Sequence, residues 1–222
     1  MIGLVFFNPA DPMMLLEIIC AAKTSDKTLA TSVSFARDIK KIPIVVNDGP
    51  GFYVTRQLIA LMGAAVYLTA DGVDGENIEA AMVDFGMPMG PATLADLTGI
   101  DIGYHVGKTF EKRLGERYRI HPLTEAIYKT GCYGRKTGAG YFDYSGNQPV
   151  PNPKVVEVVQ KYLRNNKVTP KEMSKEDIID AMLALGINEA ALMMAALALF
   201  LVPLLGLLAG AILGSALAGE LI

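Results

Sequence analysis

The sequence predicts an α/β segment, the end of a Rossmann-like domain, followed by a mostly α-helical domain and an apolar C-terminal helix. Three observations lead to this prediction. Short apolar runs surround a helical pattern in residues 1–47, a broad apolar stripe with helical spacing begins after residue 53, and residues 190–219 carry no charged side chain. A chain of 222 residues is long enough for one or two domains with a real core.

The first segment alternates strand and helix signals. Thr24-Ser25-Asp26 offers N-cap residues for a helix that runs to about Lys40. Short runs of apolar residues before and after this helix are expected to be strands: Ile2–Phe7, Met13–Ile19 and Ile42–Val46. Residues 1–47 are therefore predicted to be the end of a Rossmann-like NAD-binding domain.

The character of the sequence changes at the glycine-proline turn 47–51, where we place a domain boundary. Residues 48–146 are predicted to form a helical domain, residues 147–175 a linker and a helix, and residues 176–222 the start of a second helical unit that runs into an apolar tail. Helices are expected over the following ranges: 54–71, about 74–85, about 92–114, 122–128 and about 154–164.

Charge and cysteine content exclude several classes of function. The net charge is −3 and there is no basic block, so we expect no nucleic-acid partner. Cys20 and Cys132 have no paired spacing, which argues against a disulfide framework and a zinc site and favours a reducing compartment. No signal peptide is recognisable at the N-terminus.

Glu17 is the most unusual polar residue of the first segment. On a strand it would share a face with Leu15 and Ile19, and burying an unpaired carboxylate there is costly. Two interpretations follow. Either the strand lies at an edge where Glu17 reaches solvent, or the carboxylate is oriented towards a catalytic partner.

Three motifs carry a resemblance to a known family. They are Val5-Phe6-Phe7-Asn8-Pro9 with Glu17 twelve positions after Val5, Asp48–Arg56, and Gly134–Tyr141. Together they resemble the 3-hydroxyacyl-CoA dehydrogenases, most closely the multifunctional α-subunits of fatty-acid oxidation. The resemblance covers about residues 3–145. It implies oxidation of (3S)-3-hydroxyacyl-CoA to 3-ketoacyl-CoA with NAD, in a mitochondrion or a bacterial cytoplasm.

The resemblance also implies roles for single residues. Glu17 matches the catalytic-site glutamate that holds a histidine base, and Thr55 matches a position that meets the substrate's thioester carbonyl. Asn8 is expected at the boundary of cofactor and substrate, and Lys136 is expected to reach the dinucleotide. The partners implied are an acyl-CoA substrate and a second copy of the chain, joined through the helical domain.

Two departures from the family pattern put activity in doubt. Val5 stands where the family has its catalytic histidine, and valine cannot accept a proton. No G-x-G-x-x-G follows a strand, so we expect the NAD cradle to lie upstream of this sequence. His105 and His121 are interpreted as structural or surface residues. The chain alone is expected to be inactive, and the alternative is a non-catalytic dimerising or acyl-CoA-binding module, with or without a membrane tether.

The apolar tail leaves three accounts open. Residues 190–219 are long enough to span a bilayer, and Gly206, Gly210 and Gly214 recur every four residues, as in packed membrane helices. The abrupt change of composition is equally typical of a disturbed reading frame or an artificial tail. A helix buried in an oligomer is the third account.

Overall fold

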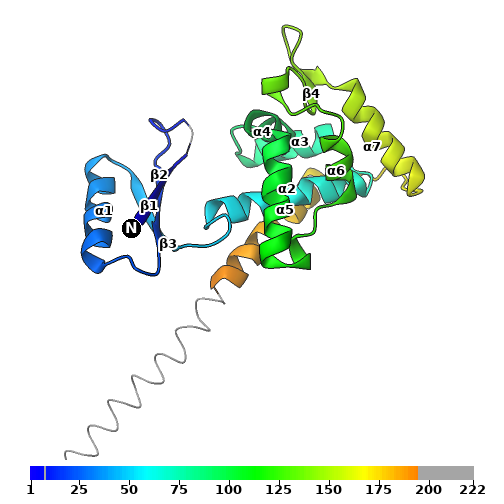
Figure 1. The fold of residues 1–222 in the computed structure, drawn as a ribbon. Coiled ribbons are helices and arrows are strands. Elements are labelled where there is room, and N and C mark those ends of the chain that lie inside the picture. Colours follow the sequence, from blue (N-terminus) through cyan, green and yellow to red (C-terminus); the bar gives the residue numbers. More distant parts are fainter. Residues whose placement is uncertain (8, 195–222) are drawn as a thin grey trace, which may run out of the picture.

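The computed structural model describes residues 1–7 and 9–194. Its first part is a three-stranded sheet covered on one face by a helix (Figure 1). The elements are β1 (Ile2–Phe6), β2 (Leu15–Cys20), α1 (Asp26–Asp38) and β3 (Ile42–Asn47). The order is β1-β2-β3, with β1 antiparallel and β3 parallel to β2. The three predicted strands and the predicted helix are all confirmed, and Ser25 accepts the capping hydrogen bond from Thr28 N–H.

The central strand β2 separates two different environments. Leu16 and Ile18 are fully buried and pack with Ala36 of α1. Glu17 points to the opposite face and is also fully buried. The interpretation of Glu17 as a solvent-reaching residue on an edge strand is therefore wrong, because β2 has a neighbour on each side.

The remaining elements are mostly helical. The helices are α2 (Val54–Ala70), α3 (Gly75–Phe85), α4 (Pro91–Thr98), α5 (Ile100–Leu114), α6 (Pro122–Tyr128) and α7 (Pro153–Asn165), and residues 175–194 form one more. Between them lie two short 3₁₀ turns, η1 (Glu116–Tyr118) and η2 (Arg135–Thr137), and a small hairpin of β4 (Phe142–Asp143) and β5 (Val150–Pro151).

Helix α2 is central to this helical region, as its broad apolar stripe predicts. Ala64 and Leu68 of α2 pack against α3 and the helix 175–194, where Met182 is fully buried. On another side, Ala70 packs with a cluster formed mainly by α5, α6 and α7, and Val66 lies against that cluster. Helix α2 therefore contributes buried residues to both clusters of the helical core.

One helix prediction is wrong. The single helix expected from Ala92 to about Leu114 is two helices, α4 and α5, that meet at Gly99. Gly99 has φ +102°, a backbone conformation that side chains disfavour, and it ends α4 while it begins α5. Both helices have apolar residues at helical spacing, so periodicity alone conceals the break.

The predicted apolar C-terminal helix lies largely outside the described residues, which end at Met194. Within residues 1–7 and 9–194, none of the helices combines the length and the apolarity that a membrane span requires.

The position of Met182 gives a test of whether the helix 175–194 belongs to the core. Met182 is fully buried, whereas Met194 on the same helix is 67 % exposed. We expect Met182→Ala to lower the free energy of unfolding by about 2–4 kcal/mol, because it leaves a cavity beside α2 and α3. Met194→Ala is the matched control and should change it by less than about 0.5 kcal/mol. Equal urea midpoints for the two variants would contradict this packing.

Candidate functional site

Glu17 connects the sheet to the helical region through one of its carboxylate oxygens. Its Oε1 accepts hydrogen bonds from the backbone N–H groups of Tyr53 (3.0 Å) and Val54 (2.9 Å), at the beginning of α2. The first N–H groups of a helix lack partners within the helix and carry partial positive charge, so a carboxylate is a favourable cap. The side chain of Tyr53, the N-cap residue, makes no capping bond itself. The cap therefore comes from a strand that lies 36 residues earlier in the chain.

The turn before α2 is shaped for this contact. Gly51 has φ +71° and Phe52 has φ +46°, which turns the chain sharply into the helix. The ring of Phe110, a buried residue of α5, lies against Gly51 so closely that a Cβ atom there would overlap it. Glycine is thus required at position 51 both by its conformation and by the close packing of Phe110.

Val5 lies directly opposite Glu17 in the register of β1 and β2. Directly opposed residues of an antiparallel pair have Cβ atoms about 4.5–5.5 Å apart and face the same side of the sheet. The second carboxylate oxygen of Glu17, Oε2, is buried and accepts no hydrogen bond from any residue that the structure describes. A side chain at position 5 that carries a hydrogen-bond donor would therefore reach a carboxylate already fixed in place.

Thr55 follows immediately after the two capped residues. It lies in the first turn of α2, is half-buried, and lines a mostly apolar cavity of about 1360 Å³ within the helical region. Leu58, Ile59 and Met62 of the same helix continue the lining. The structure thus places Glu17 and Thr55, two of the predicted site residues, near the beginning of α2.

Lys136 occupies a different place. It lies on η2, between Gly134 and Gly138, which both have positive φ. Its Nζ lies 2.5 Å from Oδ1 of Asp101, and the hydrogen bond from Lys136 holds the pKa of that carboxyl below its usual value. The side chain of Lys136 remains 45 % exposed. No contact with Glu17 or Thr55 is present among the described residues, and Asn8, the fourth predicted site residue, lies outside them.

Asp96 organises the loop that carries Lys136, a role that the residues around Asp96 do not predict. Its carboxylate is buried and accepts hydrogen bonds from Tyr141 N–H (2.8 Å), Phe142 N–H (2.9 Å) and the Tyr144 hydroxyl (3.0 Å). Burial raises the pKa of Asp96, and the three hydrogen bonds oppose that rise. A motif Asp-Leu-Thr-Gly resembles an ordinary helix end, so only the fold reveals that Asp96 reaches a loop more than forty residues away.

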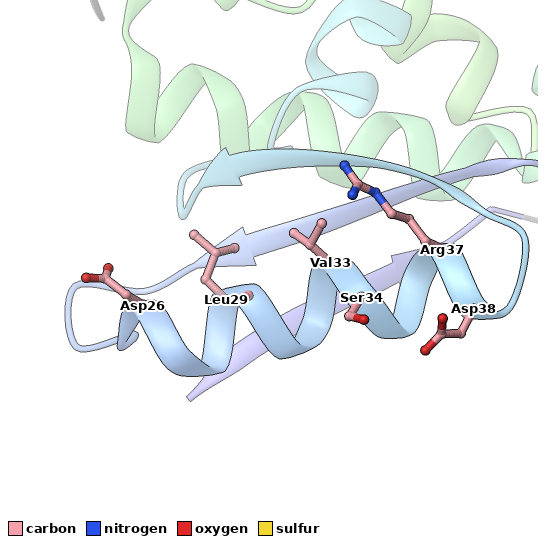
Figure 2. Close-up of a pocket in the computed structure, with 7 residues that line it drawn as sticks. Asp26, Leu29, Val33, Ser34, Arg37 and Asp38 are labelled. Atoms are coloured by element: carbon pink, nitrogen blue, oxygen red, sulfur yellow. The ribbon is translucent and has the colours of Figure 1, made fainter.

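Two further features carry no chemistry. His121 caps α6 through Nδ1, which accepts from Leu123 N–H at 3.2 Å, and its burial lowers its pKa. A hollow of about 450 Å³ on α1 is lined by residues such as Asp26, Leu29 and Arg37, and Figure 2 shows them along one side of the helix. None of the predicted site residues belongs to this hollow. Within the described part of the chain, no three His, Cys, Asp or Glu side chains lie close enough to hold a metal ion.

Comparison with known proteins identifies the two parts of the chain. Residues 1–49 match the family model of the 3-hydroxyacyl-CoA dehydrogenase NAD binding domain, and residues 51–144 match that of its C-terminal domain. Both domains are those of a dehydrogenase in which an α/β part precedes a helical part. The chain belongs to the 3-hydroxyacyl-CoA dehydrogenase family.

Individual relatives agree with this. The fatty acid oxidation complex subunit alpha of Shewanella sp. (strain MR-4) is 42 % identical over 175 residues, which is 78 % of this chain and 25 % of that protein. In Shewanella oneidensis the same subunit is 45 % identical over 143 residues, 64 % of this chain and 20 % of that protein. The chain therefore spans about a quarter or less of the length of these relatives.

Solved structures place the same fold in smaller dehydrogenases. The (S)-3-hydroxybutyryl-CoA dehydrogenase from Ralstonia eutropha aligns with a TM-score of 0.62 and 34 % identity, over 65 % of this chain and 52 % of that one. The dehydrogenase part of multifunctional enzyme 1 from C. elegans aligns with a TM-score of 0.60 and 25 % identity, over 85 % of this chain and 42 % of that one.

NAD is the cofactor of the family, but the residues of this chain do not fit its pyrophosphate. The connection from β2 to α1 is Ala21-Ala22-Lys23-Thr24-Ser25, which contains no glycine. The sequence contains no G-x-G-x-x-G, the turn that brings backbone N–H groups against a dinucleotide.

Removal of the Glu17 carboxylate tests its structural role. Glu17→Ala leaves the amides of Tyr53 and Val54 without their acceptor in a buried place, so we expect a loss of about 2 kcal/mol in the free energy of unfolding. Glu17→Gln keeps an acceptor oxygen and should lose less than about 1 kcal/mol, chiefly the interaction of charge with the helix dipole. Urea denaturation measures both. If the alanine variant were as stable as the glutamine variant, the cap would not contribute.

Proposed function

We propose that this chain supplies the acyl-CoA-facing part of a 3-hydroxyacyl-CoA dehydrogenase of fatty-acid β-oxidation. In that reaction a (3S)-3-hydroxyacyl-CoA is oxidised to the 3-ketoacyl-CoA. One observation carries the proposal: Glu17, the position opposite it on β1, and Thr55 converge where the sheet meets α2. Membership of the family and the names of the bacterial relatives support the same pathway.

Each residue has a defined part in this proposal. Thr55 donates its hydroxyl hydrogen to the thioester carbonyl of the acyl-CoA, and the adjoining apolar cavity accommodates apolar atoms of the substrate. Glu17 holds its orientation through the amides of α2 and would hold a base at position 5. Lys136 presents a cation on a glycine-bounded turn, where it would face a dinucleotide phosphate, and Asn8 would lie between the cofactor and the substrate.

The proposal also covers the domain bounds of the chain, its oligomeric partner and its location in the cell. We place the end of the α/β domain at residue 47, the helical domain at 48–146, a linker and helix at 147–175, and a second helical unit from 176. A second copy of the chain would join through the helical domain. The bacterial relatives favour the bacterial cytoplasm over a mitochondrion, and association with a membrane would require residues 190–219.

A second candidate is a binding module without catalysis. Val5 favours it, because an aliphatic side chain opposite Glu17 leaves the site without a general base. On this alternative, the chain binds acyl-CoA or dimerises, and the reaction itself is not catalysed.

Both candidate functions require that this site bind an acyl-CoA, so a binding measurement tests the two together. We expect the chain to bind acetoacetyl-CoA, and Thr55→Val to weaken binding about fivefold to tenfold, because it removes one hydrogen bond while keeping the shape of the side chain. Isothermal titration calorimetry gives the dissociation constants. The control is Thr109→Val, whose hydroxyl donates to His105 O within α5. Equal affinity of the Thr55 and Thr109 variants for acetoacetyl-CoA would show that Thr55 does not contribute to binding.

Restoring a base distinguishes a dehydrogenase from a binding module. The chain should be joined behind the dinucleotide-binding part of a relative, with and without Val5→His. With acetoacetyl-CoA and NADH, we expect Val5→His to raise the rate of NADH consumption by about 10²–10⁴-fold, the usual contribution of a positioned general acid or base. The same substitution combined with Glu17→Gln should lose most of that gain. No gain, with acyl-CoA binding intact, would favour the binding module.

A further inference from the structure

Beyond the predicted site, a buried charge cluster lies next to Thr55. Glu189, on the helix 175–194, is only 2 % exposed. Its Oε1 accepts from Nε of Arg56 at 2.8 Å, and Nη2 of Arg56 lies at the same distance. Arg117 forms an ion pair with the other oxygen, and the Tyr118 hydroxyl donates to Oε1. A carboxylate this deeply buried is stable only because two guanidinium groups and a phenol surround it.

Gln57 makes a second connection to the same helix. In the amide orientation that satisfies both neighbours, it donates to the carbonyl of Gly186 (2.7 Å) and accepts from the N–H of Ala190 (3.0 Å). The Gly186 carbonyl and the Ala190 N–H are the acceptor and donor of one i→i−4 hydrogen bond of the helix, so the Gln57 amide contacts both groups of that bond. Arg56 and Gln57 follow Thr55 directly in the sequence, and both contact the helix 175–194.

The cluster also reaches the turn before α2. The Tyr118 ring packs edge-on against Phe110, with centroids 5.6 Å apart, and Phe110 lies against Gly51. Glu17 holds the amides of Tyr53 and Val54 from the side of the sheet. The first turn of α2 thus contacts two buried carboxylates, Glu17 through the amides of Tyr53 and Val54 and Glu189 through the side chain of Arg56, and Thr55 lies between these residues in the sequence.

We propose that Glu189 is a positioning residue that fixes the first turn of α2 through Arg56 and thereby orients the Thr55 hydroxyl towards the acyl thioester. The inference rests on the proposed acyl-CoA binding at Thr55. It assigns the segment Ile187-Asn188-Glu189-Ala190 to the substrate site of the preceding helical domain, in addition to any role in a second helical unit.

A double-variant cycle in the full chain tests this. Glu189→Gln keeps the shape of the side chain but removes its charge, so Arg56 is held less firmly. We expect it to weaken binding of acetoacetyl-CoA about fivefold in calorimetry. In a Thr55→Val background it should have almost no further effect, because its influence passes through the missing hydroxyl. A general loss of structure would weaken binding in both backgrounds.

The matched control is Glu111→Gln. Glu111 on α5 is a partly buried carboxylate that accepts from Nζ of Lys108 at 2.9 Å, and it does not line the cavity next to Thr55. We expect this variant to retain wild-type affinity. Independent effects of Glu189→Gln and Thr55→Val on binding would overturn the inference and leave the proposed function intact. A wild-type chain that does not bind acetoacetyl-CoA would overturn both.

A second variant covers the case in which Glu189→Gln does not fold. Arg56→Lys keeps the positive charge but loses the two-pronged contact with Glu189. It should raise the hydrogen-exchange rate of the amides in residues 55–58 and weaken binding about threefold to fivefold, again only when Thr55 is present. Unchanged exchange in these amides would overturn the proposed positioning.

Discussion

The burial of Glu17 is the constraint on which the relation of sheet and helices depends. A carboxylate without contact with solvent must receive hydrogen bonds, or its burial would cost several kcal/mol. Here the bonds come from the first amides of α2, which themselves need an acceptor. Neither part satisfies its polar groups alone, so the contact couples the α/β segment to the helical domain. Because the cap uses the backbone, it fixes the direction of α2 relative to β2 without requiring a particular side chain at Tyr53 or Val54.

The helical domain then builds outward from α2. Its two core clusters lie on different sides of this helix, one with α3 and the helix 175–194 and the other with α5, α6 and α7. Glu189 is a second buried carboxylate that contacts the beginning of α2, here through the side chain of Arg56, and it also pairs with Arg117 and accepts from the Tyr118 hydroxyl on η1. The difference is chemical. Glu17 binds amides that any sequence provides, whereas Glu189 depends on the side chains of Arg56, Arg117 and Tyr118, and through Arg56 it couples the helix 175–194 to the residues beside Thr55.

Local patterns were sufficient to predict most of the elements, and contacts between distant residues were not predictable. The apolar runs of β1, β2 and β3 and the Ser25 cap of α1 depend on neighbouring residues, so the sequence shows them. The break between α4 and α5 at Gly99 was not predicted, because the sequence does not show whether a glycine within a periodic stretch adopts positive φ. Glu17 and Thr55 are predicted as site residues from the resemblance of their motifs to those of the family. Glu189 pairs with a residue 133 positions away, and no local pattern signals such a partner.

Valine at position 5 is compatible with a buried Glu17, because capping α2 and holding a base on β1 are separate roles of this carboxylate. If the carboxylate were held only by a histidine on β1, an aliphatic residue there would leave an uncompensated buried charge, and the sheet would lose several kcal/mol. In this chain Oε1 is satisfied by α2 instead, so the orientation of Glu17 does not depend on its cross-strand neighbour. The scaffold can therefore keep its fold and the first turn of α2 while position 5 carries no proton acceptor. The fold of this part of the chain is in this sense physically separable from proton transfer at position 5, and the loss of the second need not remove the first.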